Sequence, residues 1–374
     1  MRPIDGFLSI DEQFHRNMKI DFLITKMSDG GAQRVVSLLA NYLADRDHEV
    51  RIITFRDGDH YPLHEKVKRI KMHQKPLIDS VVFSGFFSLL SFYRKKSNRP
   101  DVMSSHIDLL GYMTIPIARI FNIKIIVSEH NNHLSRYTYQ ERFLWKFLYP
   151  MASAVTVLTQ FDLPYFQKKN RRTVVMPNPY SFQVASRVSL SDERKKEVMA
   201  IGNLNRVHHK GFDNLMDIVK EISSMHPEWK FVIVGAGNGG RPQLEARIKE
   251  LGISDYVTLM GFRKDIKELL SRTGIYILPS RFEGLPMTLL EAMSQGVPCI
   301  AYDCISGPGD IIRDGETGLL IENQNMDEMI KGLSQLIQSP ELRDKFSQNA
   351  PGSLEKYSIE KVGAKWENLI EQIT

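Results

Sequence analysis

Short apolar runs alternate with longer amphipathic segments along almost the whole chain, and this alternation limits the possible folds more than any other feature. The runs that predict buried strands in the first half are residues 20–25, 50–55, 123–128 and 154–158. Strands that alternate with helices in this way form parallel sheets with right-handed crossovers. We therefore expect an α/β fold with little or no antiparallel sheet.

The alternation stops near Met176-Pro-Asn-Pro-Tyr180 and then starts again, which indicates two domains in a chain of 374 residues. The predicted strands of the second half are residues 198–202, 230–235, 256–260, 274–279 and 298–302. The expected division is an N-terminal extension at 1–17, a first domain at 18–180, a linker at 181–196, a second domain at 197–355 and a closing helix at 356–374. Ligands of such sheets bind beyond the carboxyl ends of the strands, so we expect two Rossmann-like domains facing a central cleft.

Composition excludes several classes of protein. Apolar residues make up 42% of the chain and charged residues 25%, as in a globular protein with sizeable cores. Lysine and arginine exceed aspartate and glutamate by 49 − 44 = 5, a mild excess that suits an anionic ligand or an acidic membrane surface. We expect no nucleic-acid partner. The two cysteines, Cys299 and Cys304, resemble reduced thiols without a metal-site pattern.

Targeting signals are not evident in the sequence. No apolar span reaches the length of a transmembrane helix, and residues 1–17 contain no long apolar run of the kind found in a signal peptide. We therefore expect a cytoplasmic protein that is at most peripheral on the inner face of the membrane.

The strongest chemical signal lies in residues 280–296, directly after the predicted strand that ends at Pro279. Pro286 suits the first turn of a helix, and Gly284 lets a ligand approach the backbone. The N-terminus of a helix offers free N–H groups to a phosphate. Glu283 and Glu291 could each accept hydrogen bonds from two sugar hydroxyls, although two glutamates eight residues apart are equally typical of a solvated surface.

Five motifs together carry a resemblance to a known family. Glu283-Gly-Leu-Pro-Met-Thr-Leu-Leu-Glu291 resembles the Glu-x7-Glu signature of glycosyltransferase family 4, whose members are retaining enzymes of the GT-B fold. The four further segments that match the family in order are Gly30-Gly-Ala-Gln-Arg-Val, Ser128-Glu-His130-Asn, Lys210-Gly211 and residues 307–320. The resemblance extends from about Met18 to the C-terminus.

The resemblance implies a role for each matching residue. The catalytic residues would be Glu283, His130 and Lys210. Glu283 would contact the donor hexose, His130 would hydrogen-bond that sugar, and Lys210 would lie beside the diphosphate. Glu291 would hold the ribose hydroxyls. The other donor-binding residues would be Gly30, Gly31, Arg206, Gly284 and Leu285. Fixed cations and N–H dipoles lower the barrier to departure of a charged leaving group, so we expect no metal and no cofactor besides the sugar nucleotide.

One position departs from the family pattern. Family members usually carry an arginine directly after the glycine of the strand that opens the second domain, whereas Asn203 follows Gly202 here. Arg206 could supply the guanidinium from a shifted position; otherwise Lys210 and the helix N-terminus would serve the diphosphate alone.

Two motifs compete with this interpretation. Gly235-Ala-Gly-Asn-Gly-Gly240 fits the dinucleotide fingerprint, but the next predicted strand ends in Gly261-Phe262 without a ribose-binding acid, so we interpret it as a turn at the cleft. Asp57-Gly-Asp59 matches the Asp-x-Asp metal motif but lies in a polar loop, where a surface turn is the better interpretation.

The first domain also contains a candidate membrane-binding surface. Residues 81–93 are apolar and aromatic, Arg94-Lys-Lys96 follows, and residues 168–172 form a second basic cluster. Such a combination suits an anionic lipid surface, while an ordinary crossover helix at 81–92 explains the apolar residues equally well.

The sequence thus predicts a retaining glycosyltransferase. It would move a hexose or N-acetylhexosamine from a UDP-sugar to a growing bacterial surface glycan, with a polyprenyl-pyrophosphate-linked acceptor as the expected partner. The alternatives are a dinucleotide-dependent oxidoreductase built on residues 235–240 and a non-catalytic protein that binds sugar nucleotides.

Overall fold

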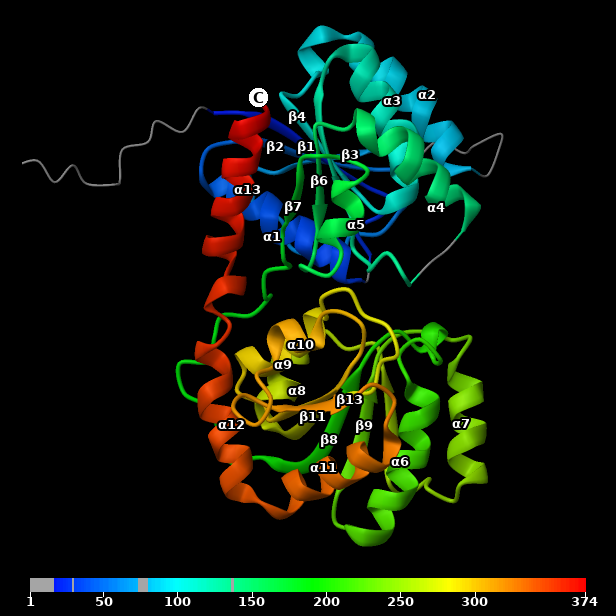
Figure 1. Ribbon diagram of the computed structural model, residues 1–374, viewed down its shortest axis with the longest axis vertical. Helices are drawn as coiled ribbons and strands as arrows, with labels where there is room; N and C mark the ends of the chain where they lie inside the picture. The colour runs from blue at the N-terminus through cyan, green and yellow to red at the C-terminus, as the bar shows by residue number, and fades with distance from the viewer. Residues whose placement is uncertain (1–16, 29, 73–79, 136–137) are drawn as a thin grey trace, which may run out of the picture.

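The computed structural model describes residues 17–28, 30–72, 80–135 and 138–374, so the predicted extension at 1–17 falls outside the described residues except for Asn17. Two parallel sheets lie one above the other, and helices cover both of them (Figure 1). Every strand pair recorded between named strands is parallel. The expected α/β fold of two doubly wound domains is confirmed.

The first sheet has the strand order β3-β2-β1-β4-β5-β6-β7. Its strands are β1 (Lys19–Ile24), β2 (Glu49–Thr54), β3 (Lys68–Lys71), β4 (Val102–His106), β5 (Lys124–Ser128), β6 (Ala154–Val157) and β7 (Thr173–Val175). Its helices are α1 (Gly31–Asp45), α2 (Val81–Arg94), α3 (Gly111–Phe121), α4 (Tyr139–Phe143) and α5 (Leu163–Gln167), with a π-helical turn at Leu144–Leu148 and 3₁₀ turns at Lys96–Asn98, Asp108–Leu110 and Tyr149–Met151. Helix α1 belongs to the hydrophobic cluster on one face, while α2 and α3 belong to the cluster on the other.

The second sheet has the order β10-β9-β8-β11-β12-β13. Its strands are β8 (Lys195–Ile201), β9 (Lys230–Val234), β10 (Val257–Gly261), β11 (Thr273–Leu278), β12 (Cys299–Asp303) and β13 (Leu319–Glu322). Its helices are α6 (Phe212–Met225), α7 (Arg241–Glu250), α8 (Ile266–Arg272), α9 (Met287–Ser294), α10 (Pro308–Ile311), α11 (Met326–Gln338) and α12 (Pro340–Gly352), with 3₁₀ turns at Leu204–Arg206 and Glu355–Tyr357.

The last helix, α13 (Ile359–Ile373), follows the second domain in sequence but packs on the first. Its buried Trp366, Leu369 and Ile370 join the hydrophobic cluster around α1, and the ribbon shows α13 running alongside the first domain (Figure 1). The chain therefore passes between the domains twice, and a backbone hydrogen bond of 3.0 Å from Tyr180 to Tyr357 joins the two passages.

Strand β4 is the central strand that the apolar pattern misses. Its sequence, Val-Met-Ser-Ser-His, contains three polar residues, yet all five side chains are buried. Ser105 accepts a 2.9 Å hydrogen bond from Thr114 of α3, and Ser104 and His106 are 2.9 Å apart. Internal hydrogen bonds thus offset the cost of burying polar groups, and the strand escapes detection by hydrophobicity.

Candidate active site

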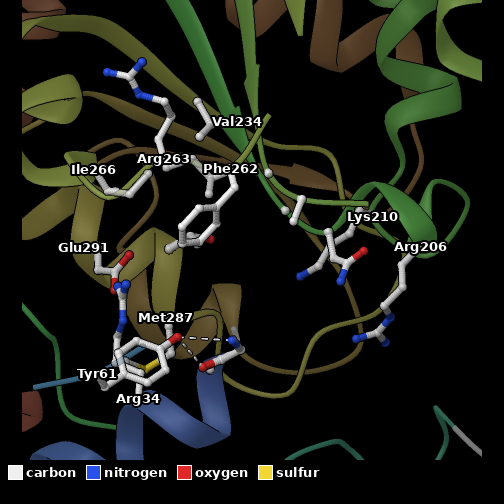
Figure 2. A pocket seen from close by; sticks show the side chains of 18 residues that line it. Arg34, Tyr61, Arg206, Lys210, Val234, Phe262, Arg263, Ile266, Met287 and Glu291 are labelled. Atoms are coloured by element: carbon white, nitrogen blue, oxygen red, sulfur yellow. Dashed lines mark hydrogen bonds and ion pairs between the residues drawn. The ribbon is translucent and has the colours of Figure 1, made fainter. Parts of the chain in front are cut away.

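Two adjoining cavities, of about 390 and 420 Å³, lie between the carboxyl ends of the two sheets. Both are lined by Gly30, Gly31, Arg206, Lys210, Met287 and Thr288, so they form one continuous cleft with walls from both domains. Figure 2 shows the side chains that line the first cavity, with Arg34 and Tyr61 on one side and Lys210 on the other. This is the position that the doubly wound topology predicts for a ligand.

The loop before α9 brings the two domains into close contact. A Cβ atom at Gly284 would lie 2.8 Å from the carbonyl oxygen of His130, so only glycine permits this approach without a shift. The amide of Asn132 donates to the backbone carbonyl of Glu283 at 2.7 Å, and that of Asn178 donates to Leu285 at 3.1 Å. These contacts fix the loop across the cleft, and α9 then begins directly after Pro286.

The Lys210-Gly211 pair is placed by a backbone constraint. Gly211 has a φ of 67°, and a Cβ atom there would lie 1.9 Å from the carbonyl oxygen of Pro279. Glycine is therefore required for the start of α6 to approach the end of β11. This approach carries Lys210 to the Glu283 loop, where its Nζ lies 2.7 Å from Oε1 of Glu283.

The Lys210–Glu283 pair is largely buried, with side-chain exposures of 17% and 9%. Burial raises the pKa of Glu283, but the charge of Lys210 and its hydrogen bond outweigh burial and leave that pKa below its ordinary value. The carboxylate is therefore ionised and the ammonium group is held at the wall of both cavities. The pair thus presents one fixed positive and one fixed negative group to the same ligand.

Glu291, in α9, is paired with a residue that the sequence interpretation did not select. Its carboxylate forms an ion pair with Arg34 of α1 and accepts a 2.8 Å hydrogen bond from Ser181. The Arg34 guanidinium also lies over the rings of Tyr61 and Phe182, at 5.3 and 5.7 Å from their centroids. Figure 2 shows Arg34, Tyr61 and Glu291 close together on one side of the first cavity. Arg34 thus links the first domain to the glutamate expected to hold ribose.

The departure at Asn203 has a local structural consequence. The side-chain oxygen of Asn203 accepts a 2.8 Å hydrogen bond from the backbone N–H of Asn205, which starts the 3₁₀ turn Leu204–Arg206. That turn places Arg206 in the walls of both cavities, with Nη2 at 2.6 Å from Nε2 of His209. A guanidinium is therefore available at the cleft from the shifted position.

His130 lies at the carboxyl end of β5 and lines the second cavity. Its Nε2 is 2.9 Å from Nδ1 of His106, at the end of the neighbouring strand β4. Burial lowers the pKa of His130 to about 4, and burial followed by the proximity of His130 lowers the pKa of His106 further. Both imidazoles are therefore neutral at physiological pH.

The competing motifs have structural explanations. A Cβ atom at Gly235 would lie 1.8 Å from the carbonyl oxygen of Gly202, and one at Gly240 would lie 1.7 Å from that of Leu204. These glycines let the β9–α7 turn pack on the β8–α6 loop, and Gly235 also lines the first cavity. Asp59 pairs with Arg69 at 3.0 Å and with Lys71, so it joins its polar loop to β3.

All nine residues selected from the sequence line the cleft. Arg206, Lys210, Gly30 and Gly31 line both cavities; Glu291 lines the first; His130, Glu283, Gly284 and Leu285 line the second. Residues that the sequence interpretation missed are Arg34, Tyr61, His106, Asn132 and Asn178. Only Arg34 carried a usable signal, because it lies inside the quoted motif that begins at Gly30.

The described part of the chain contains neither a candidate metal site nor a candidate membrane span. Within it, no group of three or more histidine, cysteine, aspartate or glutamate side chains is arranged to hold a metal ion. None of its helices combines the length and the apolar character that a membrane span requires. Cys299 and Cys304 are both buried free thiols.

Comparison with known proteins identifies the family. Residues 29–183 match the family model described as Glycosyltransferase Family 4, and residues 181–353 match Glycosyl transferases group 1. The chain is 31% identical over 366 residues to the amylovoran biosynthesis glycosyltransferase AmsD of Erwinia amylovora, covering 94% of this chain and 99% of that protein. It is 29% identical over 367 residues to the GalNAc-alpha-(1->4)-GalNAc-alpha-(1->3)-diNAcBac-PP-undecaprenol alpha-1,4-N-acetyl-D-galactosaminyltransferase of Campylobacter jejuni, covering 95% and 99%.

Solved structures support the same fold. HepE of Anabaena, in complex with UDP and glucose, has a TM-score of 0.81 at 17% identity and covers 95% of this chain and 100% of its own. A TarM mutant of S. aureus has a TM-score of 0.74 at 16% identity, covering 94% and 100%. These likenesses confirm the GT-B arrangement. Together with the cleft and its motifs, the comparisons show that the chain belongs to glycosyltransferase family 4 and is a glycosyltransferase of the GT-B fold.

Proposed function

We propose that the protein transfers a hexose or N-acetylhexosamine from a UDP-sugar, with retention of configuration, to a lipid-carrier-linked glycan of a bacterial surface polysaccharide. The observation that carries this proposal is the buried Lys210–Glu283 pair beside the start of α9, in a cleft with room for a sugar nucleotide. UDP is bound in the solved structure of HepE, and the Campylobacter relative is named for an acceptor on PP-undecaprenol.

The charges of the cleft suit departure of a nucleoside diphosphate. When the bond from the anomeric carbon to the diphosphate breaks, both bonding electrons go to the phosphate oxygen. Lys210, Arg206 and the N-terminus of α9 would stabilise the charge that collects there. The Glu283 carboxylate would accept hydrogen bonds from the donor sugar and balance positive charge near the anomeric carbon. The acceptor hydroxyl oxygen then bonds to that carbon on the face that the diphosphate leaves, and its proton passes to the departing phosphate oxygen.

The Arg34–Glu291 pair supports an assignment of the nucleoside end of the cleft. Glu291 is 1% exposed, and its carboxylate faces Arg34 in the first cavity, beside Tyr61 and Phe262. Aromatic walls beside a buried carboxylate suit a nucleoside, since the carboxylate accepts hydrogen bonds from ribose hydroxyls and the rings cover the base.

A panel of UDP- and GDP-sugars, offered with a lipid-pyrophosphate-linked acceptor, tests the proposal. We expect one UDP-sugar to give a product, an anomeric NMR signal of unchanged configuration, and an unchanged rate with EDTA. Normal UDP binding without transfer or donor hydrolysis would instead identify a non-catalytic sugar-nucleotide-binding protein. An inverted product would refute retention, and loss of activity with EDTA would refute a metal-independent reaction.

The pH dependence of the transfer rate follows from the two shifted groups at the cleft. The pKa of Glu283 lies below its ordinary value and that of His130 at about 4, so neither changes its protonation state between pH 6 and 8. We expect kcat to show no inflection near pH 6.5, the ordinary pKa of histidine. A steady-state pH profile checks this, and an acidic limb near 6.5 that disappears in His130→Gln would contradict it.

A surface of exposed aromatic residues suits peripheral contact with a membrane. Phe83 and Phe87 of α2 are 51% and 53% exposed, and Phe143 and Phe147, beside α3, are each 51% exposed. We call these four residues the aromatic surface. The buried face of α2 packs on the first domain's core through Leu89 and Tyr93, as expected of a crossover helix, which leaves Phe83 and Phe87 exposed for the proposed membrane contact. Aromatic side chains of this kind insert at lipid headgroups.

Basic residues of the first domain also favour contact with an anionic membrane. Lys146 lies over the ring of Phe147, with Nζ 5.1 Å from the centroid. Arg94-Lys-Lys96 and residues 168–172 both precede strands of the same parallel sheet, β4 and β7. Both basic clusters therefore lie at the amino ends of the strands of the first domain. Each basic residue near an anionic surface contributes about 1 kcal/mol of attraction.

Replacing the four phenylalanines of the aromatic surface with serine is expected to abolish flotation with anionic liposomes. Activity on a lipid-linked acceptor should fall about tenfold or more, because about 0.8 kcal/mol is lost for each methylene-sized group no longer buried in lipid. Donor hydrolysis should not change. Met225→Ser, at a 50% exposed apolar residue of the second domain, is the matched control. Equal flotation of the quadruple variant and the control would remove the membrane proposal.

A further inference from the structure

A chain of three hydrogen-bonding side chains leads from the interior of the first sheet to the cleft. Ser104 Oγ lies 2.9 Å from Nε2 of His106, and Nδ1 of His106 lies 2.9 Å from Nε2 of His130. Ser104 and His106 are on β4, and His130 follows the neighbouring parallel strand β5. The chain ends at the second cavity, which His130 lines.

The direction of these hydrogen bonds can be deduced from Ser104. The residue is 1% exposed, and among the described residues its hydroxyl has no side-chain or backbone partner other than His106. A buried hydroxyl donor requires an acceptor, so Ser104 donates to Nε2 of His106. A neutral imidazole has one N–H, and that of His106 must then be at Nδ1, where it donates to Nε2 of His130.

The assignment of one N–H to each neutral ring also determines which nitrogen of His130 is protonated. Its Nε2 accepts from His106, so the single proton of the neutral ring is on Nδ1. Nδ1 has no partner among the described residues and belongs to a ring in the wall of the second cavity. His130 thus offers an N–H donor, rather than an acceptor, on the side of the cleft that Glu283 also lines.

Packing holds the ring of His106, the middle member of the hydrogen-bonded series, in place. The His106 ring is fully buried, with the rings of Phe22 and Trp366 centred 5.6 and 5.9 Å from its own. Trp366 belongs to α13, so the C-terminal helix helps to fix an imidazole directly behind the cleft.

We propose that His106 is a positioning residue that fixes His130 as an N–H donor toward an oxygen atom of the bound donor sugar. The proposal rests on the proposed function for the identity of the ligand, whereas the tautomer of His130 is a property of the protein alone. Ser104 donates to His106 and so determines which way the hydrogen bonds run. His106 then donates to His130, and His130 makes the contact with the ligand.

Nitrogen-15 NMR of the imidazole rings tests the tautomer directly, with His130→Gln used to assign the signals. We expect Nδ1 of His130 to be protonated and Nε2 to be unprotonated from pH 6 to 8. Ser104→Ala removes the terminal donor without disturbing the packing, and both tautomers of His130 should then be populated. A wild-type ring protonated on Nε2, or an unchanged ring in Ser104→Ala, would overturn the proposal.

Kinetic measurements on two variants distinguish a positioning role of His106 from a role in packing alone. His106→Gln places an amide toward Ser104 and loses the bond to His130, whereas His106→Asn places an amide N–H where Nδ1 was. We expect kcat to fall about tenfold in His106→Gln, the value of one hydrogen bond, and to recover to within about threefold of wild type in His106→Asn. The Kd for UDP should stay unchanged in both variants.

The control is His226→Gln, because His226 also pairs with a serine, Ser334 at 2.8 Å, but does not line either cavity of the cleft. Its kcat should equal that of the wild type. Equal losses in His106→Gln and His106→Asn would show that His106 only fills space. If no donor in the panel supports transfer, the proposed function fails, while the NMR result still decides whether His106 orients His130.

Discussion

Replacement of Lys210 by alanine is expected to lower kcat by about 10²- to 10³-fold, the usual effect of removing one oriented group that stabilises developing charge. Lys210 Nζ is held 2.7 Å from Glu283, at the wall shared by both cavities. Its charge would be used mainly after the glycosidic bond begins to break. The KM for the donor should therefore rise much less than kcat falls, which steady-state kinetics with the preferred UDP-sugar will measure.

Lys249→Ala is the matched control, since Lys249 is exposed on α7 and outside both cavities. Its kinetic constants should equal those of the wild type. Lys210→Arg keeps the charge but changes its geometry, and we expect intermediate activity. Full activity of Lys210→Ala would show that the ammonium group does not serve the leaving group.

Replacement of Glu283 by glutamine is expected to lower kcat by about 10²-fold, again with a smaller change in KM. The substitution keeps the size of the side chain and removes the negative charge that we propose lies beside the anomeric carbon. It also leaves the ammonium group of Lys210 without its counter-ion in a largely buried site. Single-turnover transfer, measured at saturating donor, reports this loss without interference from product release.

Glu291→Gln provides the comparison within the same motif. The carboxylate of Glu291 pairs with Arg34 in the first cavity, away from the Lys210–Glu283 pair. Its loss should raise the Kd for UDP more than it lowers kcat. Because Lys210 and Glu283 are in contact, their double variant should lose less than the product of the two single losses. Independent effects would contradict a shared role.

The sequence was sufficient for the architecture wherever strands are apolar throughout. Strand β11, with the sequence Thr-Gly-Ile-Tyr-Ile-Leu, and strand β9 were found from their apolar runs, and their bounds differ from the prediction by no more than one residue. Strands β3, β7 and β13, which are three or four residues long, were missed, although β6, also of four residues, was found. Strand β4 was missed because three of its five residues are polar and their burial is offset by hydrogen bonds that the hydrophobic pattern does not reveal.

The site shows a similar division. Glu283, Lys210 and His130 could be selected because each lies in a motif that follows a strand, and parallel strands bring such motifs to one edge. Arg34 also lies in such a motif, but its pairing with Glu291 depends on a contact across 257 residues of sequence, and His106, which lies in none of the motifs, is joined to His130 across 24 residues. Local patterns thus predict which loops meet at the cleft, but not which side chains pair once the loops have met.

The C-terminal helix α13 has a consequence for the order in which the protein is made. Trp366, Leu369 and Ile370 complete the hydrophobic cluster around α1, although more than 300 residues separate the two helices. During synthesis the first domain emerges from the ribosome with the part of the α1 cluster that α13 covers still exposed, and the second domain is translated before α13 is made. The first domain therefore reaches its final packing only after α13 has been translated, so part of its hydrophobic cluster stays uncovered during synthesis of the second domain.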